Sequence, residues 1–323
     1  MDHHLFISNS DDMRKYFIHL LKFLVFAMIF YVAFIIMSGR LLPNFLRQNL
    51  LYTLGGNGHT HSRLRDVKNT NSVDILCIGS SRAYRGFDIR IYKSAGFSSF
   101  NLGTSNQTPV QSLFLLKKYL SQLRPQTIIF EVNPDIFSND GVESAIDIIS
   151  NESPDINLLK MARQTKNIKV WNTLIYSFFN KWTGIEDNFS ESASKNGQTY
   201  NKGGYVSIEN QRYDRTKGTS YYCKLNKIQL TAFEEICSLS ASKDIQLLLI
   251  QSPVTSSVYH TCTENEHFDR LMSQKAAYFN FNKLIHLTDT LHFSDGQHLN
   301  QLGVAALNKE IIKLGPFRHK TFE

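Results

Sequence analysis

Length, composition and charge limit what this chain can be. Its 323 residues are 42% hydrophobic and 20% charged, which is typical of a folded globular protein and excludes a wholly disordered or fibrous chain. The net charge is +7, but the basic residues are scattered among acidic ones and form no recognisable nucleic-acid module. We therefore expect one main core and no nucleic-acid partner.

The N-terminal region contains an apolar stretch from Tyr16 to Gly39, with Lys22 as its one definite charge. The stretch exceeds the roughly 20 residues that a membrane-spanning helix needs, and it lacks the polar stripe of a buried core helix. A cleaved signal peptide is the nearer competitor, but no A-x-A-like cleavage site follows. Arg14, Lys15 and Lys22 lie on the N-terminal side and Arg40 and Arg47 on the other. This modest bias favours a cytoplasmic N-terminus, so the rest of the chain is expected to face the periplasm or the exterior.

After this anchor, short apolar segments alternate with amphipathic ones. The run at 73–78 is rich in β-branched residues and stops at Gly79, which is typical of a buried parallel strand that ends in a tight turn. Further strands are expected at 97–102, 127–132 and 245–251, and helices at 110–123, 225–240 and 301–314. This order predicts an α/β fold with a doubly wound, mostly parallel sheet.

The cysteines and histidines show no metal-binding spacing. Cys77 lies in an apolar run and is expected in the core, and no two cysteines have the C-x-x-C redox spacing. The sequence leaves open whether Cys223 and Cys262 form a disulfide in an oxidising compartment. No metal site and no organic cofactor are expected.

Two segments far apart in the sequence carry reactive side chains: GSSRAYRGFD from Gly79 to Asp88, and FSDGQHLNQLG from Phe293 to Gly303. A serine hydroxyl becomes an effective nucleophile when an imidazole takes its proton and a carboxylate orients that imidazole. Ser81, His298 and Asp295 supply these three groups. The first segment follows the first core strand, at the sheet edge where open α/β folds place their sites.

These segments resemble the first and last sequence blocks of the SGNH (GDSL-like) hydrolases, G-D-S and D-x-x-H. Here the first block reads G-S-S, which places the nucleophile at Ser81 and puts Ser80 in the usual aspartate position. Ser80 is the fallback nucleophile. The resemblance covers about residues 73–135 and 225–315, and it implies an SGNH-type three-layer fold, preceded here by one N-terminal transmembrane helix.

The resemblance also implies an oxyanion hole, in which N–H groups stabilise the charge that develops on the carbonyl oxygen. The backbone of Ser81 is one expected donor. Gly103 in FNLGTSNQTP is the second, with an ordinary turn glycine as the alternative. Asn133 in EVNPD is the nearest match to the third donor, with Asn106 as a rival and a turn-forming role as the alternative.

Three charged residues near Ser81 are not assigned to the chemistry. Asp88 is expected to start a helix, and Arg82 and Arg85 are expected to be solvated. Binding of an anionic substrate by these residues is the alternative.

The chemistry implied is that of an esterase or O-acyltransferase, in which Ser81 attacks an ester carbonyl and the acyl group passes to water or another hydroxyl. A single-pass anchor in the bacterial inner membrane suggests an acylated envelope or surface glycan as the substrate, with acetyl as the acyl group. We expect an O-acetylesterase. The alternatives are an O-acyltransferase of the same class and a non-catalytic glycan-binding or assembly protein on an SGNH scaffold.

The expected organisation has five parts. These are a cytoplasmic tail at 1–15, a transmembrane anchor at 16–39, a linker at 40–72, an SGNH-like catalytic domain at 73–315 with an insertion at about 138–222, and a C-terminal tail at 316–323. The insertion is rich in Asn, Ser, Lys and Tyr and shows poor periodicity. It is either a lid that shapes substrate choice or a packing decoration.

Overall fold

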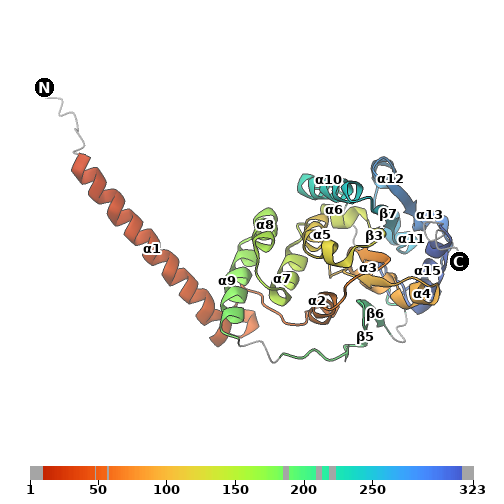
Figure 1. The fold of residues 1–323 in the computed structure, drawn as a ribbon, viewed down its shortest axis with the longest axis horizontal. Helices are drawn as coiled ribbons and strands as arrows, with labels where there is room; N and C mark the ends of the chain where they lie inside the picture. The colour runs from red at the N-terminus through yellow and green to blue at the C-terminus, as the bar shows by residue number, and fades with distance from the viewer. Residues whose placement is uncertain are drawn as a thin grey trace, which may run out of the picture.

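The computed structural model describes residues 10–47, 49–56, 58–184, 189–208, 213–217 and 223–314. The C-terminal tail expected at 316–323 lies outside the described residues, as do residues 1–9 of the expected cytoplasmic tail. A long helix, α1 (Ser10–Leu41), extends away from an α/β domain that contains the other helices and the strands (Figure 1).

A five-stranded sheet forms the centre of the α/β domain. All neighbouring strands are parallel, in the order β2-β1-β3-β7-β8. The strands are β1 (Ile75–Ile78), β2 (Ser99–Asn101), β3 (Thr127–Glu131), β7 (Gln246–Gln251) and β8 (Ala277–Asn280). The chain passes from β1 to one edge and then returns to build the other side, so the sheet is doubly wound and the predicted fold class is confirmed.

Helices cover both faces of this sheet, because alternate residues of a buried strand point to opposite sides. Ile75 and Cys77 of β1 contribute to one apolar cluster, together with residues of α3 (Ser81–Gly86), α4 (Ile89–Ser94) and α15 (Gln301–Lys313). Leu76 and Ile78 contribute to the other, together with residues of α2 (Thr60–Lys68), α5 (Pro109–Leu123), α10 (Lys227–Ser242) and α12 (Asn265–Ser273). The domain therefore has three layers.

The predicted strands and helices of the core agree with the observed ones to within two residues at each end. The edge strand β8 is not among the predicted strands. Its sequence, AYFN, has four residues, of which only Asn280 is buried. No long apolar run marks this strand, because it is short and its position at the sheet edge leaves residues 277–279 exposed or half-buried.

The expected insertion is largely helical in its first half. After α6 (Pro134–Ser138), which precedes it, the insertion contains α7 (Val142–Asn151), α8 (Ile156–Thr165) and α9 (Ile168–Trp182). These helices are followed by an antiparallel sheet of β4 (Ser194–Lys195), β5 (Gln198–Asn201) and β6 (Tyr205–Ile208). Ile146 and Ile149 of α7 belong to the same apolar core as α5. Helix α7 of the insertion is thus packed into the main domain.

The expected linker is packed in the same way. Leu64 and Val67 of α2 belong to the same apolar core, and the Arg63 guanidinium donates to the carbonyl of Gly204, between β5 and β6, at 2.9 Å.

Four short elements complete the described helices. They are the 3₁₀ helix η1 (Asn44–Leu46), α11 (Ser256–Tyr259), α13 (Phe281–Leu284) and α14 (Asp289–His292).

Helix α1 is the one helix of the described residues that is long and apolar enough to cross a membrane. Most of its large apolar side chains are exposed, unlike those of a core helix. Near its C-terminal end it packs against α9. The Tyr31 hydroxyl donates to Oδ1 of Asn172 at 2.6 Å, and the Arg40 guanidinium lies 4.9 Å from the ring centre of Phe179.

Cys223 and Cys262 form a disulfide between residues 39 positions apart. The pair packs with Val254 and Val258, in the segment that follows β7. Cys77 is buried in β1, as predicted, and burial raises the pKa of its thiol.

We expect loss of this disulfide to lower the thermal stability. A cross-link that closes a loop of this length restricts the unfolded chain, which stabilises the fold by about 3–4 kcal/mol. Cys223→Ser and Cys262→Ser should therefore each lower Tm by roughly 10 °C in differential scanning fluorimetry. Cys237→Ser, which changes a free cysteine, is the control and should leave Tm almost unchanged. Equal Tm values in all three variants would contradict the cross-link.

Candidate active site

The turn after β1 presents two serines at the carboxyl end of the sheet. Gly79 has a φ of +137°, which glycine adopts far more readily than other residues. A side chain at this position would meet Cβ of Glu131 at 2.6 Å. Ser80 is the N-cap of α3 and Ser81 is its first residue. The turn therefore holds Ser81 at a helix N-terminus, close to the end of β3.

Ser81, His298 and Asp295 lie in one hydrogen-bonded chain. Oγ of Ser81 is 2.8 Å from Nε2 of His298, and Nδ1 of His298 is 2.9 Å from both carboxylate oxygens of Asp295. When Nδ1 donates its proton to the carboxylate, the lone pair of Nε2 faces the serine hydroxyl. The fold thus brings together the three residues predicted from two distant segments.

Ser81, and not Ser80, contacts His298. Ser80 is 1% exposed. Its amide donates to Oε2 of Glu131 at 2.8 Å, and its hydroxyl accepts from the amide of Arg82 at 3.3 Å. Ser80 is a buried capping residue, so the geometry favours Ser81 as the candidate nucleophile.

The loop that carries Asp295 and His298 is stabilised by hydrogen bonds within the loop and by hydrogen bonds from a neighbouring segment. Oδ1 of Asp295 accepts the amides of Gln297 at 2.8 Å and of His298 at 3.0 Å. The amide and the hydroxyl of Thr255, in the segment after β7, both donate to the Gly296 carbonyl at 3.0 and 3.1 Å. These bonds fix the imidazole before any substrate binds.

The surroundings shift the pKa values of both partners downward. Burial, the largest effect, lowers the pKa of His298; the hydrogen bond to Asp295 opposes this, and the charges of Arg85 and Arg82 reinforce it. Burial raises the pKa of Asp295, but the hydrogen bonds from His298 and from the amides of Gln297 and His298 outweigh it and leave that pKa lowered. A neutral imidazole beside an ionised carboxylate is the arrangement that a general base needs.

Two expected oxyanion donors already have acceptors. The Gly103 amide donates to Oδ1 of Asn101 at 3.0 Å, and Nδ2 of Asn133 donates to Oε1 of Glu131 at 2.5 Å. Both residues follow carboxyl ends of strands, β2 and β3, as the sequence blocks require.

The remaining two candidates differ in their environment. Asn106 has a positive φ of +48°, and its side-chain amide donates to Glu143 at 2.5 Å. The amide of Ser81 is at the first position of α3, where an N–H group has no acceptor within the helix. Such a group is well placed to meet a developing negative charge.

Arg82 is buried, which corrects the prediction that it is solvated. Its side chain is 4% exposed. It donates to Oε1 of Glu131 at 3.1 Å, to Oε1 of Gln297 at 2.9 Å, and to the two carboxylate oxygens of Asp135 at 2.6 and 2.8 Å. The carboxylates of Glu131, at the end of β3, and Asp135, in α6, offset the cost of removing the guanidinium from water.

Glu131 is a residue of the site that the sequence does not reveal. It is fully buried and accepts hydrogen bonds from the Ser80 amide, Arg82 and Asn133. It ends β3 one residue beyond the pair Ile78–Phe130, so it lies level with the turn after β1. The one signal in the sequence is an acidic residue at the end of an apolar run.

Asp88 and Arg85 have separate roles. Asp88 is the N-cap of α4 and accepts from the Arg90 amide at 2.9 Å, as predicted. Arg85 is half-buried and lines a cavity of about 10 Å³ together with Arg82, Gln297 and His298. This cavity is about large enough for one water molecule.

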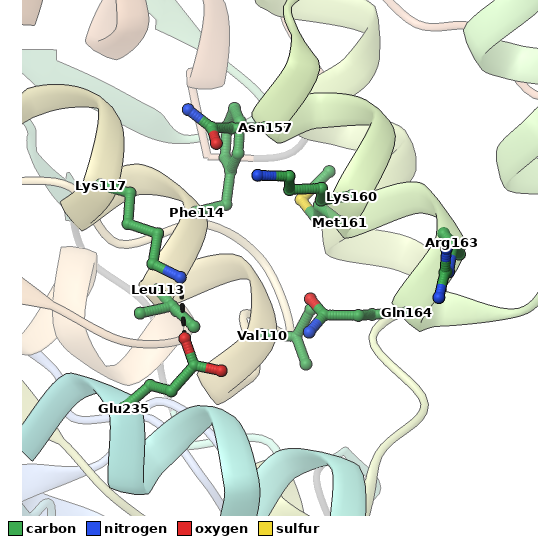
Figure 2. A pocket seen from close by; sticks show the side chains of 10 residues that line it. All are labelled: Val110, Leu113, Phe114, Lys117, Asn157, Lys160, Met161, Arg163, Gln164 and Glu235. Atoms are coloured by element: carbon green, nitrogen blue, oxygen red, sulfur yellow. Dashed lines mark hydrogen bonds and ion pairs between the residues drawn. The ribbon is translucent and has the colours of Figure 1, made fainter.

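A much larger cavity, of about 560 Å³, lies between α5, α8 and α10 (Figure 2). Its lining includes Lys117, Lys160, Arg163 and Glu235 and none of the three residues of the hydrogen-bonded chain. Within the described ranges, no three His, Cys, Asp or Glu side chains are grouped so that they would hold a metal ion.

No protein-family model matches this chain, and no curated protein matches it. Solved structures do. A GDSL-like lipase from Bacteroides thetaiotaomicron is 11% identical over 76% of this chain and 89% of its own, with a TM-score of 0.37. A proposed acylhydrolase from Bacteroides fragilis is 12% identical over 84% of this chain and 94% of its own, with a TM-score of 0.37.

A third structure, of a proposed platelet activating factor protein from Streptococcus pneumonia, is 14% identical over 79% of this chain and 89% of its own, with a TM-score of 0.41. The lipase is described by the term GDSL-like, the class that the sequence blocks resemble. Identities and TM-scores this low transfer neither a substrate nor a catalytic role to this chain.

We expect the pKa of His298 to lie below the usual histidine value and to respond to its neighbours with opposite signs. Arg85→Gln removes a positive charge and should raise this pKa, whereas Asp295→Asn removes the partner that favours the imidazolium and should lower it further. NMR titration of the ring protons, assigned with His298→Asn, measures both shifts. Arg90→Gln is the distant control. Shifts of the same sign in both variants would contradict this electrostatic description.

We expect Arg82→Met to destabilise the fold by about 3–5 kcal/mol, because it leaves the buried carboxylate of Glu131 without its cationic partner. Arg270→Met breaks an ion pair with Glu266 in which the two side chains are 66% and 85% exposed, and should cost less than about 1 kcal/mol. Urea denaturation of both variants gives the two values. Similar losses for the two arginines would show that burial of the Arg82 pair does not matter.

Proposed function

We propose that this protein is a serine-dependent acyl-ester hydrolase of the SGNH type, acting as an O-acetylesterase on an envelope or surface glycan. The observation that carries the proposal is the continuous chain from Oγ of Ser81 through the imidazole of His298 to the carboxylate of Asp295, with contacts of 2.8 and 2.9 Å. These distances are within the range for proton transfer between a nucleophile and its base.

In the proposed mechanism, Oγ of Ser81 attacks the ester carbonyl while Nε2 of His298 takes the hydroxyl proton. Asp295 stabilises the imidazolium and keeps its orientation. The tetrahedral intermediate collapses, the C–O bond to the leaving alcohol breaks, and Nε2 gives its proton to that alcohol. A water molecule then attacks the acyl-enzyme with His298 again as the base, which releases the acid and regenerates the serine.

The amide of Ser81 is the proposed first donor to the oxyanion. Gly103 and Asn133 are the proposed second and third donors, but in the free protein they donate to Asn101 and Glu131. Each must therefore turn toward the substrate when it binds, or share its donor between two acceptors. Loss of one such donor typically costs about 3–4 kcal/mol of transition-state stabilisation.

The surroundings of His298 admit water. A cavity of about 10 Å³ borders the imidazole, which is close to the room that one water molecule needs. His298 retains 17% exposure of its side chain, so water has access to the base. Access of water favours hydrolysis over transfer of the acyl group to a second alcohol.

The proposed location is the outer face of a bacterial inner membrane, with α1 as an uncleaved single-pass anchor. The hydrogen bond from Tyr31 to Asn172 and the contact of Arg40 with Phe179 join α1 to the domain, which supports retention of the helix in the mature protein. The disulfide between Cys223 and Cys262 supports an oxidising compartment. An anchored esterase facing that compartment has envelope glycans within reach.

We expect Ser81→Ala to reduce hydrolysis of a chromogenic acetyl ester by at least about 10³-fold, since the nucleophile is lost and only binding and oxyanion contacts remain. Ser80→Ala removes the neighbouring hydroxyl and should retain activity within about tenfold. Both are assayed as the full chain in detergent, with circular dichroism to confirm folding. Equal activity of wild type and Ser81→Ala would exclude the proposed mechanism, and a selective loss in Ser80→Ala would move the nucleophile by one residue.

A further inference from the structure

Helices α8 and α9 expose large apolar side chains beside α1. The exposed fractions are 43–63% on α8 and 55–78% on α9, for Ile156, Leu159, Ile168, Phe178 and Trp182. Amphipathic helices of a globular protein normally bury such side chains. Several of them line a common surface, so they are not the isolated exposed residues that every protein surface contains.

This surface includes a groove whose other wall is α1 itself. The groove has a volume of about 500 Å³ and is lined by Val32 and Ile36 of α1 and by Trp171, Leu174, Phe178 and Trp182 of α9. Its walls are almost entirely apolar. The exposed face of α9 is therefore continuous with the proposed membrane-spanning helix.

Charge distinguishes the α8–α9 hairpin, the segment 156–182 that carries this surface, from an ordinary apolar contact. The segment 156–182 contains five cationic residues and no aspartate or glutamate. Lys160, Arg163 and Lys166 are exposed, Lys169 is half-buried, and none of these four forms an ion pair with another described residue. Figure 2 shows Lys160 and Arg163 projecting from α8, while Lys117 across the cavity is paired with Glu235. The hairpin thus carries uncompensated positive charge next to apolar side chains.

The groove lies at the position along α1 where the boundary of the membrane is expected. The hydrocarbon core of a bilayer needs about 20 helical residues, so a span that begins after Lys15 ends close to Ile35. Val32 and Ile36, which line the groove, are at this level. Tryptophan side chains and snorkelling lysines are typical of the boundary between acyl chains and headgroups.

We propose that the α8–α9 hairpin is a second membrane-contacting element, which lies in the interface of the leaflet where α1 emerges. Its apolar face and the groove contact lipid acyl chains, and Lys160, Arg163, Lys166 and Lys169 bind anionic phospholipid headgroups. This inference rests on the proposed anchoring by α1. A second copy of the chain is a less suitable occupant, because it would bring the same four cations against this surface.

The contact fixes the orientation of the catalytic domain. A single spanning helix would leave the domain free to tilt relative to the membrane plane, whereas a second contact with the same leaflet restricts that tilt. Ser81 is then carried at a constant distance from the membrane surface.

The chain has two tryptophans, Trp171 and Trp182, and both line the groove, so intrinsic fluorescence reports on this surface alone. The full chain is reconstituted in vesicles of phosphatidylethanolamine and phosphatidylglycerol, with acyl chains brominated at carbons 6 and 7. We expect brominated lipid to quench at least half of the fluorescence, and aqueous iodide to quench little. Replacing Lys160, Arg163, Lys166 and Lys169 with glutamine should weaken, at least twofold, the dependence of this quenching on the phosphatidylglycerol content of the vesicles.

The matched control replaces four exposed lysines elsewhere with glutamine, at Lys93, Lys227, Lys243 and Lys309, and should behave like the wild type. Vesicle flotation is performed first. A chain that does not float contradicts the anchor and this inference together. A chain that floats but whose tryptophans respond to iodide and not to brominated lipid overturns only the membrane contact. Tryptophans shielded from both quenchers indicate a protein partner, such as a second copy, and also overturn it.

Discussion

The buried carboxylate of Glu131 is the interaction on which the candidate site depends. It ends β3 without exposure to solvent and accepts hydrogen bonds from the Ser80 amide, the Arg82 guanidinium and the Asn133 side chain. A buried charge is stable only when donors of this kind surround it. The requirement to satisfy this one carboxylate therefore holds the turn that carries Ser81 against the neighbouring strand.

Arg82 extends this constraint to the third segment of the site. It donates to Gln297 as well as to Glu131, so it links the turn after β1, the end of β3 and the loop that carries Asp295 and His298. Support of this kind matters because a displacement of about 1 Å in a catalytic group can cost about 100-fold in rate. The sheet thus positions the candidate residues, while the proposed membrane contacts of α1 and the α8–α9 hairpin would place them at a membrane surface.

Features marked by a local sequence pattern can be predicted from the sequence, whereas contacts between residues far apart in the sequence cannot. The apolar strands and the candidate residues Ser81 and His298 are predictable because a local pattern or a family block marks each of them. The burial of Arg82 is not, since its partners lie 49, 53 and 215 residues away and are placed by the folded sheet. Helix α7 appears irregular in sequence because its residues 144–151 are all buried, and α8 because its apolar side chains Ile156 and Leu159 are exposed.

The central claim is that Ser81 is a nucleophile activated by His298. Covalent labelling of the full-length protein with a fluorophosphonate, followed by mapping of the modified residue by mass spectrometry, tests this claim most directly. The account predicts a label on Ser81 that is strongly reduced in His298→Ala. A label on Ser80, or equal labelling of Ser81 in the presence and absence of the imidazole, would contradict it.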